Sequence, residues 1–241
     1  MVEPVTKIIP MSTTSSTHIA RLLQLSDSAC PIGSFAFSCG LESAVALNIV
    51  HNADSLKEFA RATAIQSAFC DGIAAIKAHR SAQENNLPGV LNADHSLIQV
   101  KMNDESRNML TKMGLKMAEL GYNIIHDEIL DSFLYHIKNG RTPGTFPVAQ
   151  GVVYATLDIN EKELFISHQY GVINMLLSAA LRCAKVSHID TQRILFELLA
   201  DIDSLYDEVK DFTLDEMHAF CPELDILTSI HEKGKQRMFM S

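Results

Sequence analysis

The side chains that most often bind transition metals are present in this chain, but their spacing does not form a metal site. Ten histidines are spread along the sequence, and no two stand three or four residues apart, the spacing that places two imidazoles on one helical face. His126 and His136 are turned about 280° from one another around a helix. We therefore predict no metal site and interpret the histidines as surface or structural residues, with His231 set apart for a motif described below.

The five cysteines also argue against a reactive centre. Their number is odd and no C-x-x-C pair occurs, which is typical of reduced thiols in a cytosolic protein and speaks against a disulfide framework. Cys30 and Cys39 flank a Pro-Gly turn, and we expect both to be small buried apolar groups. The set is Cys30, Cys39, Cys70, Cys183 and Cys221.

Motifs of the common enzyme classes are missing as well. The sequence has no G-x-x-x-x-G-K, no G-x-G-x-x-G, no H-E-x-x-H and no G-x-S-x-G, and Gly33-Ser34 lacks the flanking glycine and the strand of a nucleophile elbow. We predict no catalytic residue, no tightly bound cofactor and a binding protein in place of an enzyme. An all-α metal hydrolase that uses scattered histidines and aspartates is the alternative from another class.

Composition and charge narrow the fold and the partners. The 241 residues are 47% hydrophobic, lack tryptophan and contain only 7% aromatic residues, which favours helices packed on helices. The net charge of −9, without a basic stripe, makes nucleic acid an improbable partner. The most apolar stretch, residues 171–180, is far shorter than the roughly 18 residues of a membrane span. We expect a soluble cytoplasmic protein with no membrane association.

Hydrophobic periodicity and breakers predict helices that would position the candidate residues. Capping boxes are predicted at Asn160 with Glu163 and at Thr213 with Glu216. We expect an all-α fold, a single globular domain of about eight to ten helices over residues 18–230, with a flexible N-terminal tail (1–17) and a C-terminal partner-binding tail (231–241). The predicted helices are a short one near 19–25, one from 38, then 56–83, 106–120, 122–138, a short apolar one after 147, 160–186 and one from 190 through 202, with 85–89 as a terminator.

Four segments together resemble the UreF family of urease accessory proteins. The first is LLQLSDSACPIGSF at 22–35 continued by SCGLE at 38–42, the second is TFPVAQG at 145–151, and the third is Tyr170 and Asn174 with residues 180–182. The fourth is the ending, His231-Glu232 followed by RMFMS at 237–241. The sequence departs from the family pattern at three places. Phe37 replaces the usual histidine, Cys30 replaces the usual phenylalanine, and residues 183–192 lack the motif that is common there in the family.

The resemblance implies that this chain takes part in metal delivery and does not itself catalyse a reaction. Members of the family are all-α, form homodimers, bind the accessory protein UreD (also called UreH) and recruit the nickel-carrying GTPase UreG. The complex delivers nickel to apo-urease and couples GTP hydrolysis to nickel insertion, so nickel is handled by the complex. A helical adaptor for a different GTPase, with no link to urease, is the second alternative.

The motif positions supply the candidate partner-binding residues. Pro31 and Gly33 would shape the loop that presents Phe35, and Ser34 would cap the helix that follows. Glu42 lies in the first turns of that helix, where a negative charge suits the helix dipole. The same motifs assign Tyr170 and His231 to partner contacts.

Two arginines are candidates for contacts with another chain, and Arg237 is the stronger of them. Arg237 can make a bidentate contact while Phe239 fills a neighbouring pocket, a pairing typical of interface hot spots. Arg182 lies on an otherwise apolar helix and needs a carboxylate or an interface, since an unpaired buried guanidinium is costly. We predict a dimer contact for Arg182.

Overall fold

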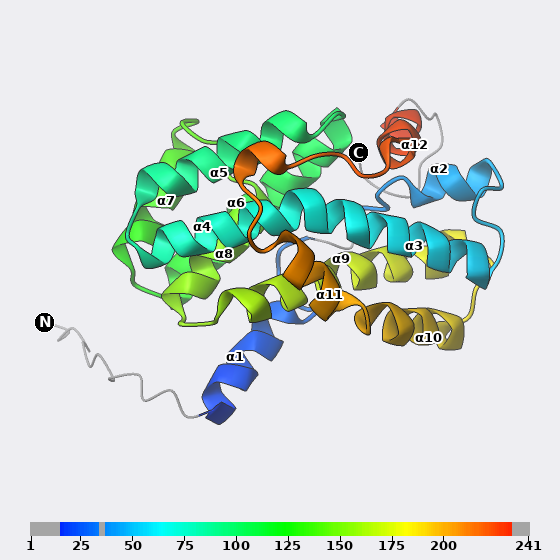
Figure 1. The fold of residues 1–241 in the computed structure, drawn as a ribbon, viewed down its shortest axis with the longest axis horizontal. Coiled ribbons are helices and arrows are strands. Elements are labelled where there is room, and N and C mark those ends of the chain that lie inside the picture. The colour runs from blue at the N-terminus through cyan, green and yellow to red at the C-terminus, as the bar shows by residue number, and fades with distance from the viewer. Residues whose placement is uncertain (1–14, 34–36, 233–241) are drawn as a thin grey trace, which may run out of the picture.

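The computed structural model describes residues 15–33 and 37–232, and every regular element within those ranges is helical, with no strand among them. The predicted all-α fold class is confirmed (Figure 1). The elements are α1 (Ser15–Ser26), α2 (Leu41–Ala46), α3 (Ala53–Ser67), the π-helix η2 (Ala68–Gly72), α4 (Ile73–Gln83), α5 (Leu87–Val100), α6 (Asp104–Ile124), α7 (Glu128–Lys138), α8 (Phe146–Thr156), α9 (Glu161–Cys183), α10 (His188–Leu199), α11 (Ile202–Val209), the 3-10 helix η3 (Leu214–Glu216) and α12 (Pro222–Glu232).

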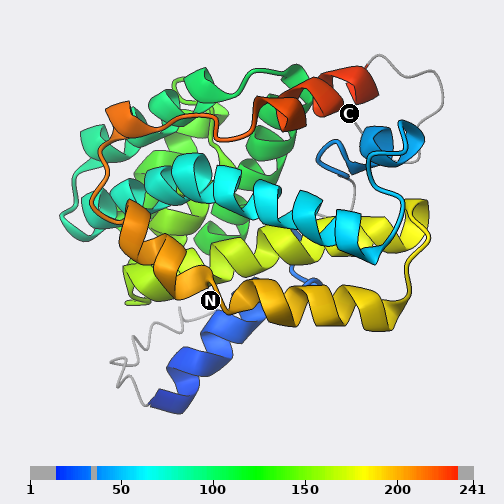
Figure 2. The ribbon, with the colours of Figure 1, turned by 45° about the vertical axis from the view of Figure 1, so that its right-hand side comes forward.

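Two packed groups of helices share α9 between them. In the first, α4 packs on α5 and α8, and α6 packs on α7 and α8. In the second, α3 packs on α9 and α10, while α2 packs on α12 and α9. Figure 2 shows α3, α9 and α10 stacked beside one another, with α12 above α2. Leu164 and Phe165 of α9 lie in the first core and Ile173 and Leu176 in the second, so this helix joins the two.

The apolar character of α9 follows from this central position. By length and composition alone α9 could cross a membrane, but 56% of its apolar window is buried inside the fold. Its start is the predicted capping box, in which the Asn160 side chain accepts from the Glu163 backbone N–H at 2.9 Å. The helix ends at Cys183, three residues before the predicted end. A core helix surrounded by other helices needs apolar residues on most of its faces.

The predicted helix 56–83 is present and starts earlier, at Ala53, where Asn52 and Ser55 form a capping box. It passes through the π-helix η2 and continues as α4, so α3 and α4 run on as one rod. The π turn shifts the register of the side chains and places Asp71, which is only 9% exposed, on the inner side of the fold. This buried aspartate is part of the site described below.

Residues 85–89 end a helix, as predicted, but they also begin a new one. Those residues end α4, but the Asn86 side chain also accepts from the Gly89 N–H at 3.1 Å, and Pro88 lies in the first turn of α5. Helix α5 was not predicted, because Asn and Pro can both end one helix and begin another.

Other predicted helix boundaries were wrong, although the predicted capping box at Thr213 was correct. The predicted helix 106–120 extends from Asp104 to Ile124, so the next helix begins at Glu128, where the Asp127 side chain caps it, and not at Tyr122. The predicted helix ending at 202 is interrupted after Leu199 and resumes as α11. The capping box at Thr213 is present but starts only the three-residue η3. Local spacing identifies caps more reliably than helix lengths.

Parts of both predicted tails are helical in the structure. Helix α1 begins at Ser15, inside the predicted N-terminal tail, and α12 extends to Glu232, so His231 belongs to the helical fold. The rest of both predicted tails, residues 1–14 and 233–241, lies outside the described residues.

A buried carboxylate holds the breaker-rich loop before α8. Asp94 of α5 is fully buried and accepts hydrogen bonds from the hydroxyls of Thr142 (2.5 Å) and Thr145 (2.6 Å) and from the backbone N–H groups of Gly144 (2.6 Å) and Thr145 (2.7 Å). Gly114 of α6 lies against the same loop, where an added Cβ would be 2.0 Å from the Gly144 carbonyl oxygen. These two contacts set the position of Phe146 at the start of α8.

Candidate interaction site

The Cys30-Pro31-Ile32-Gly33 segment forms a tight turn after α1, as predicted from its Pro and Gly. The Cys30 N–H donates to the Asp27 carbonyl at 2.9 Å, and the Ile32 N–H donates to the Cys30 carbonyl at 2.7 Å. Pro31 and Gly33 are exposed, and Gly33 adopts φ +83° with open space around it. Ser34 and Phe35, the predicted cap and the predicted partner-facing aromatic, lie outside the described residues.

The Gly-Leu-Glu sequence needs a glycine at position 40 for two reasons, the positive φ of its backbone and the close approach of helix α12. Its φ is +78°, and an added Cβ would lie 2.9 Å from the Thr228 Oγ1 and 3.1 Å from the Thr228 backbone nitrogen of α12. A side chain at this position would be strained and would also push α12 away. The next residue, Leu41, is completely buried, so α2 is anchored in the second core.

Glu42 and His231, which the sequence analysis treated as separate partner-binding candidates, contact each other. The His231 Nε2 is 2.8 Å from the Glu42 Oε2, and its Nδ1 is 2.6 Å from the Glu105 Oε2. The side chains of His231 and Glu105 are each 3% exposed and that of Glu42 is 17% exposed. We name Glu42, Glu105 and His231 the carboxylate-histidine cluster. Glu105 was missed, because an acidic residue in the first turn of a helix is usually a solvated partner of the helix dipole.

The carboxylate-histidine cluster is not built as a metal chelate. The two carboxylates lie on opposite nitrogens of one ring, so a single ion cannot be ligated by the imidazole and both acids. Elsewhere in the described residues, too, no group of three or more His, Cys, Asp or Glu side chains is arranged to hold a metal ion. The cluster instead ties together three helices, α2, α6 and α12.

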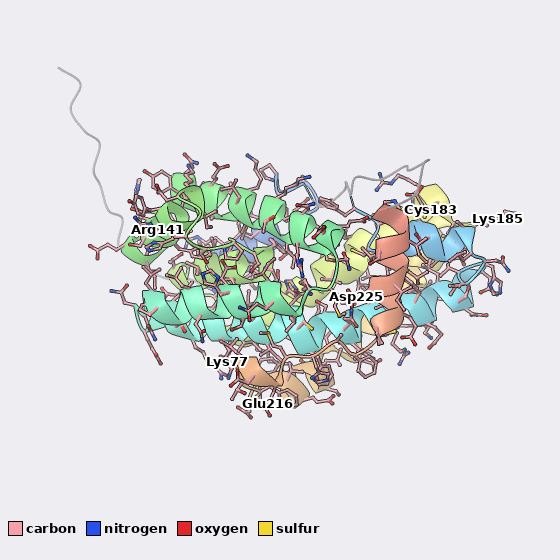
Figure 3. The ribbon with its side chains drawn as sticks, turned by 90° about the horizontal axis from the view of Figure 1, so that it is seen from above. Lys77, Arg141, Cys183, Lys185, Glu216 and Asp225 are labelled. Carbon is pink, nitrogen blue, oxygen red and sulfur yellow. The ribbon has the colours of Figure 1, made fainter. Side chains whose placement is uncertain are left out.

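A second polar cluster lies next to it under α12. The Lys101 ammonium lies 2.9 Å from the Asp71 carboxylate, and Asp225 of α12 accepts from the Asn103 amide at 3.0 Å and the Gln66 amide at 3.2 Å. Burial raises the pKa of the Asp225 carboxyl. In Figure 3, Asp225 is labelled on α12, while Cys183 and Lys185 lie toward the end of the molecule where α9 finishes.

The thiols are poor nucleophiles in this fold. Burial is the largest cause that raises the pKa of each of the five cysteines. The pKa of Cys39 rises to about 12 and those of Cys70 and Cys183 to about 11. Because the thiolate is the nucleophile and metal ligand, the raised pKa values keep these groups in the less reactive thiol form at neutral pH.

A cavity of about 150 Å³ lies between α1, α3, α6, α9 and α12. Met109 and Met113 of α6 and Met175 of α9 line it, together with Phe146, and Met113 is at the same time a buried core residue. Gly171, on the exposed side of α9, also lines it. The cavity is therefore bordered on one side by the first of the family motifs, residues 22–42, and on the other side by α12.

His168 lies in a polar chain along this cavity. It is 2% exposed, its Nδ1 lies 2.9 Å from the Gln150 Oε1, and its Nε2 lies 3.3 Å from the Ser67 hydroxyl. Burial lowers the pKa of His168 to about 4, so the ring is neutral at pH 7. The Gln150 Oε1 can only accept, so Nδ1 carries the hydrogen and Nε2 accepts from Ser67. A histidine with this pKa is a weak general base at neutral pH.

The buried His168 predicts a loss of stability in weak acid. In the unfolded chain the imidazole binds a proton near pH 6.5, whereas in the fold it binds one only near pH 4. The unfolded state therefore takes up the proton first, and as the pH falls from 6.5 to 4 the His168 contribution should lower the free energy of unfolding by about 3 kcal/mol.

Urea unfolding followed by circular dichroism at pH 7, 6, 5 and 4.5 checks this expectation. The matched variant His168→Gln cannot titrate, and its stability should fall less steeply with pH than that of the wild type. Parallel pH profiles for the two proteins would contradict the neutral, buried state of His168.

The remaining candidate residues lie apart from the carboxylate-histidine cluster. Tyr170 is half-buried against the second core. Arg182 is exposed in the last turn of α9, where a positive charge suits the C-terminal end of the helix dipole. Phe37 is 3% exposed in the core, consistent with an apolar residue in place of the family's usual histidine. Arg237 and Phe239 lie outside the described residues.

Comparisons with known proteins match this chain over most of its length. The sequence model of the UreF family matches residues 50–199. The urease accessory protein UreF of Yersinia pseudotuberculosis serotype IB (strain PB1/+) is 40% identical over 225 residues, covering 93% of this chain and 99% of the relative. The urease accessory protein UreF 2 of Brucella canis is 42% identical over 223 residues, 92% of each chain. The chain therefore belongs to the UreF family of urease accessory proteins.

Proposed function

We propose that this chain is a non-catalytic scaffold of urease maturation. It joins a UreD/UreH-type protein to the nickel-carrying GTPase UreG and couples GTP hydrolysis to nickel insertion into apo-urease in the cytoplasm. The observation that carries the proposal is the family match, 40% identity over 93% of the chain to proteins named for urease maturation. The chain acts as a homodimer, binds no cofactor tightly, and the complex as a whole handles nickel.

The chemistry of the described residues supports a scaffold. The thiols are protonated, His168 is a weak base, and the His231 ring is held between two carboxylates. None of these arrangements pairs a nucleophile with a base. A protein of this kind acts through its surfaces.

The outer face of α12 supports a partner surface near the C-terminus. Leu224, Leu227 and Thr228 point into the fold, whereas Ile226 and Ile230 are 58% and 44% exposed. Side chains four residues apart lie on one face of a helix, so these two isoleucines form a short exposed apolar strip on α12. This face leads directly into residues 233–241, which carry Arg237 and Phe239.

Co-expression with the UreD-type and UreG-type proteins of the same source tests the proposal. We expect a stable ternary complex by size exclusion with light scattering, and we expect truncation after Lys235 to abolish it, because the truncation removes Arg237 and Phe239. The same measurement gives the mass of the chain alone and so reports the dimer. Lys235→Ala is the matched control, since it changes the charge of the tail and keeps residues 236–241.

The outcomes separate the proposal from its rivals. If the full-length chain binds neither protein, the scaffold proposal fails, and bound metal and hydrolytic turnover would then support the metal hydrolase. If it binds a GTPase but its loss leaves the nickel content and activity of urease unchanged in cells, the chain is an adaptor for another process.

A further inference from the structure

Sulfur-bearing side chains from three parts of the chain meet at the cavity between α1, α3, α6, α9 and α12. One precedes α2, two belong to α6 and one belongs to α9, and they are Cys39, Met109, Met113 and Met175. We name these four side chains the sulfur group. Met109 and Met113 stand four residues apart, so they lie on one face of α6. Thiol and thioether sulfurs gathered around one cavity are the ligand set that a soft metal ion prefers.

Cys39 and Met109 are already in direct contact through their sulfur atoms. The Cys39 thiol donates a weak hydrogen bond to the Met109 Sδ, and the two sulfurs are 3.8 Å apart. Two metal–sulfur bonds of about 2.3 Å that meet at an angle of about 110° span the same distance. A metal ion can therefore replace the proton between these two sulfurs without a large movement of either side chain.

The electrostatics of the cavity oppose a bare Cys39 thiolate but do not oppose a thiolate that is paired with a cation. Burial, together with the carboxylates of Glu105 and Asp71, raises the pKa of the Cys39 thiol to about 12. A thiolate bound to a singly charged cation is neutral as a pair, so burial costs this pair much less than it costs the thiolate alone. The same two carboxylates attract a cation to this place.

The oxygen donors along the cavity are less suited to a metal than the sulfurs. The Asp71 carboxylate is paired with the Lys101 ammonium at 2.9 Å, and Asp225 accepts from the Asn103 amide at 3.0 Å. Hard cations such as Mg²⁺ and Ca²⁺ need several oxygen ligands, whereas thiolate and thioether ligands select Cu(I). We propose that the sulfur group is a binding site for one Cu(I) ion, with the Cys39 thiolate as its charged ligand and methionine thioethers as the others.

Binding at this site exchanges one proton for one copper ion. The S–H bond of Cys39 breaks, the sulfur–copper bond forms and the proton passes to the solvent, while the copper remains Cu(I) and no electron is transferred. The ion links the residue before α2 to α6 and α9, so it stabilises the folded chain. This site goes beyond the proposed function and does not depend on it.

The test is an anaerobic titration of the full-length chain with Cu(I) against a chromophoric Cu(I) chelator. Wild type is compared with Cys39→Ser, Met109→Leu and Met175→Leu, because leucine nearly conserves the volume of methionine while it removes the sulfur. The matched controls are Met117→Leu, at a buried core position on α6, and Cys183→Ser, at the end of α9. Circular dichroism checks that each variant is folded.

We expect the wild type to bind one Cu(I) ion per chain. Each of Met109→Leu and Met175→Leu should weaken binding about tenfold, and Cys39→Ser should weaken it at least about a hundredfold, since it removes the charged ligand. Met117→Leu and Cys183→Ser should bind as the wild type does. X-ray absorption of the bound copper should show sulfur neighbours at about 2.3 Å and no nitrogen or oxygen.

Three results would overturn the proposal. The first is a wild-type chain that takes up no Cu(I). The second is an unchanged affinity in both Met109→Leu and Met175→Leu, because the ion would then be held by a thiol without the thioethers. The third is displacement of the bound Cu(I) by an equal concentration of Zn²⁺, which would show that the site is not selective for a soft ion. The two methionine variants keep the test decisive even if Cys39→Ser does not fold.

Discussion

Asp94→Ala is expected to lower the free energy of unfolding by about 3 to 5 kcal/mol. The carboxylate is fully buried and accepts four hydrogen bonds from Thr142, Gly144 and Thr145. Alanine would leave two hydroxyls and two backbone N–H groups without acceptors and would open a small cavity. An unmet buried donor costs about 1 to 3 kcal/mol, and water entering the space would recover part of the sum.

Urea unfolding by circular dichroism measures the effect. Asp94→Asn should be intermediate, because the amide keeps one acceptor oxygen but turns an NH₂ group toward the donors. Glu208→Ala is the control, since Glu208 is an exposed acid on α11 and its loss should change stability by less than about 0.5 kcal/mol. A cost below about 1 kcal/mol for Asp94→Ala would show that the loop before α8 is not held by this carboxylate.

Gly114→Ala is expected to destabilise the protein by about 3 kcal/mol, although alanine is the better helix former. The added Cβ would lie 2.0 Å from the Gly144 carbonyl oxygen, 2.5 Å from the Thr145 carbonyl carbon and 2.7 Å from the Phe146 backbone nitrogen. All three neighbours are backbone atoms, so no side chain can rotate away. Helix α6 or the loop would have to move, and the Asp94 hydrogen bonds would be disturbed with them.

Gly171→Ala provides the matched comparison. Gly171 also lies inside a helix, α9, but an added Cβ there would have no atom within 4 Å. This substitution should stabilise the protein by up to about 1 kcal/mol, because alanine loses less backbone entropy in a helix. Thermal unfolding should therefore move in opposite directions for the two variants. A shift of the same sign in both would contradict the close approach of α6 to the loop.

The contacts that Asp94 and Gly114 make with the loop before α8 also affect the cavity of the candidate site. Phe146 follows directly on the loop that Asp94 and Gly114 position, and it lines the cavity together with Met109 and Met175. A shift of this loop changes the wall of the cavity between α1 and α12. Stability and the shape of this cavity are therefore coupled through the start of α8.

Most of the elements could be predicted from the sequence because their signals are local. The Asn160–Glu163 capping box is correct to the residue, since a cap depends on side chains three positions apart. The family could be identified for a similar reason, because its motifs are short runs such as the Pro-Ile-Gly and Gly-Leu-Glu sequences. Helix α5 was missed because the signals that end one helix and begin the next are the same.

By itself the sequence determined the all-helical class, the capping boxes at Asn160 and Thr213 and the membership in the family, since periodicity, capping boxes and motifs lie within a few neighbouring residues. Only the tertiary structure decided that Glu42 and Glu105 enclose His231 and that Asp94 holds the loop before α8. A carboxylate carries no local sign of which distant donor it will meet. Packing brings those groups together, and burial then makes the contact strong, because water is no longer there to compete for the hydrogen bonds.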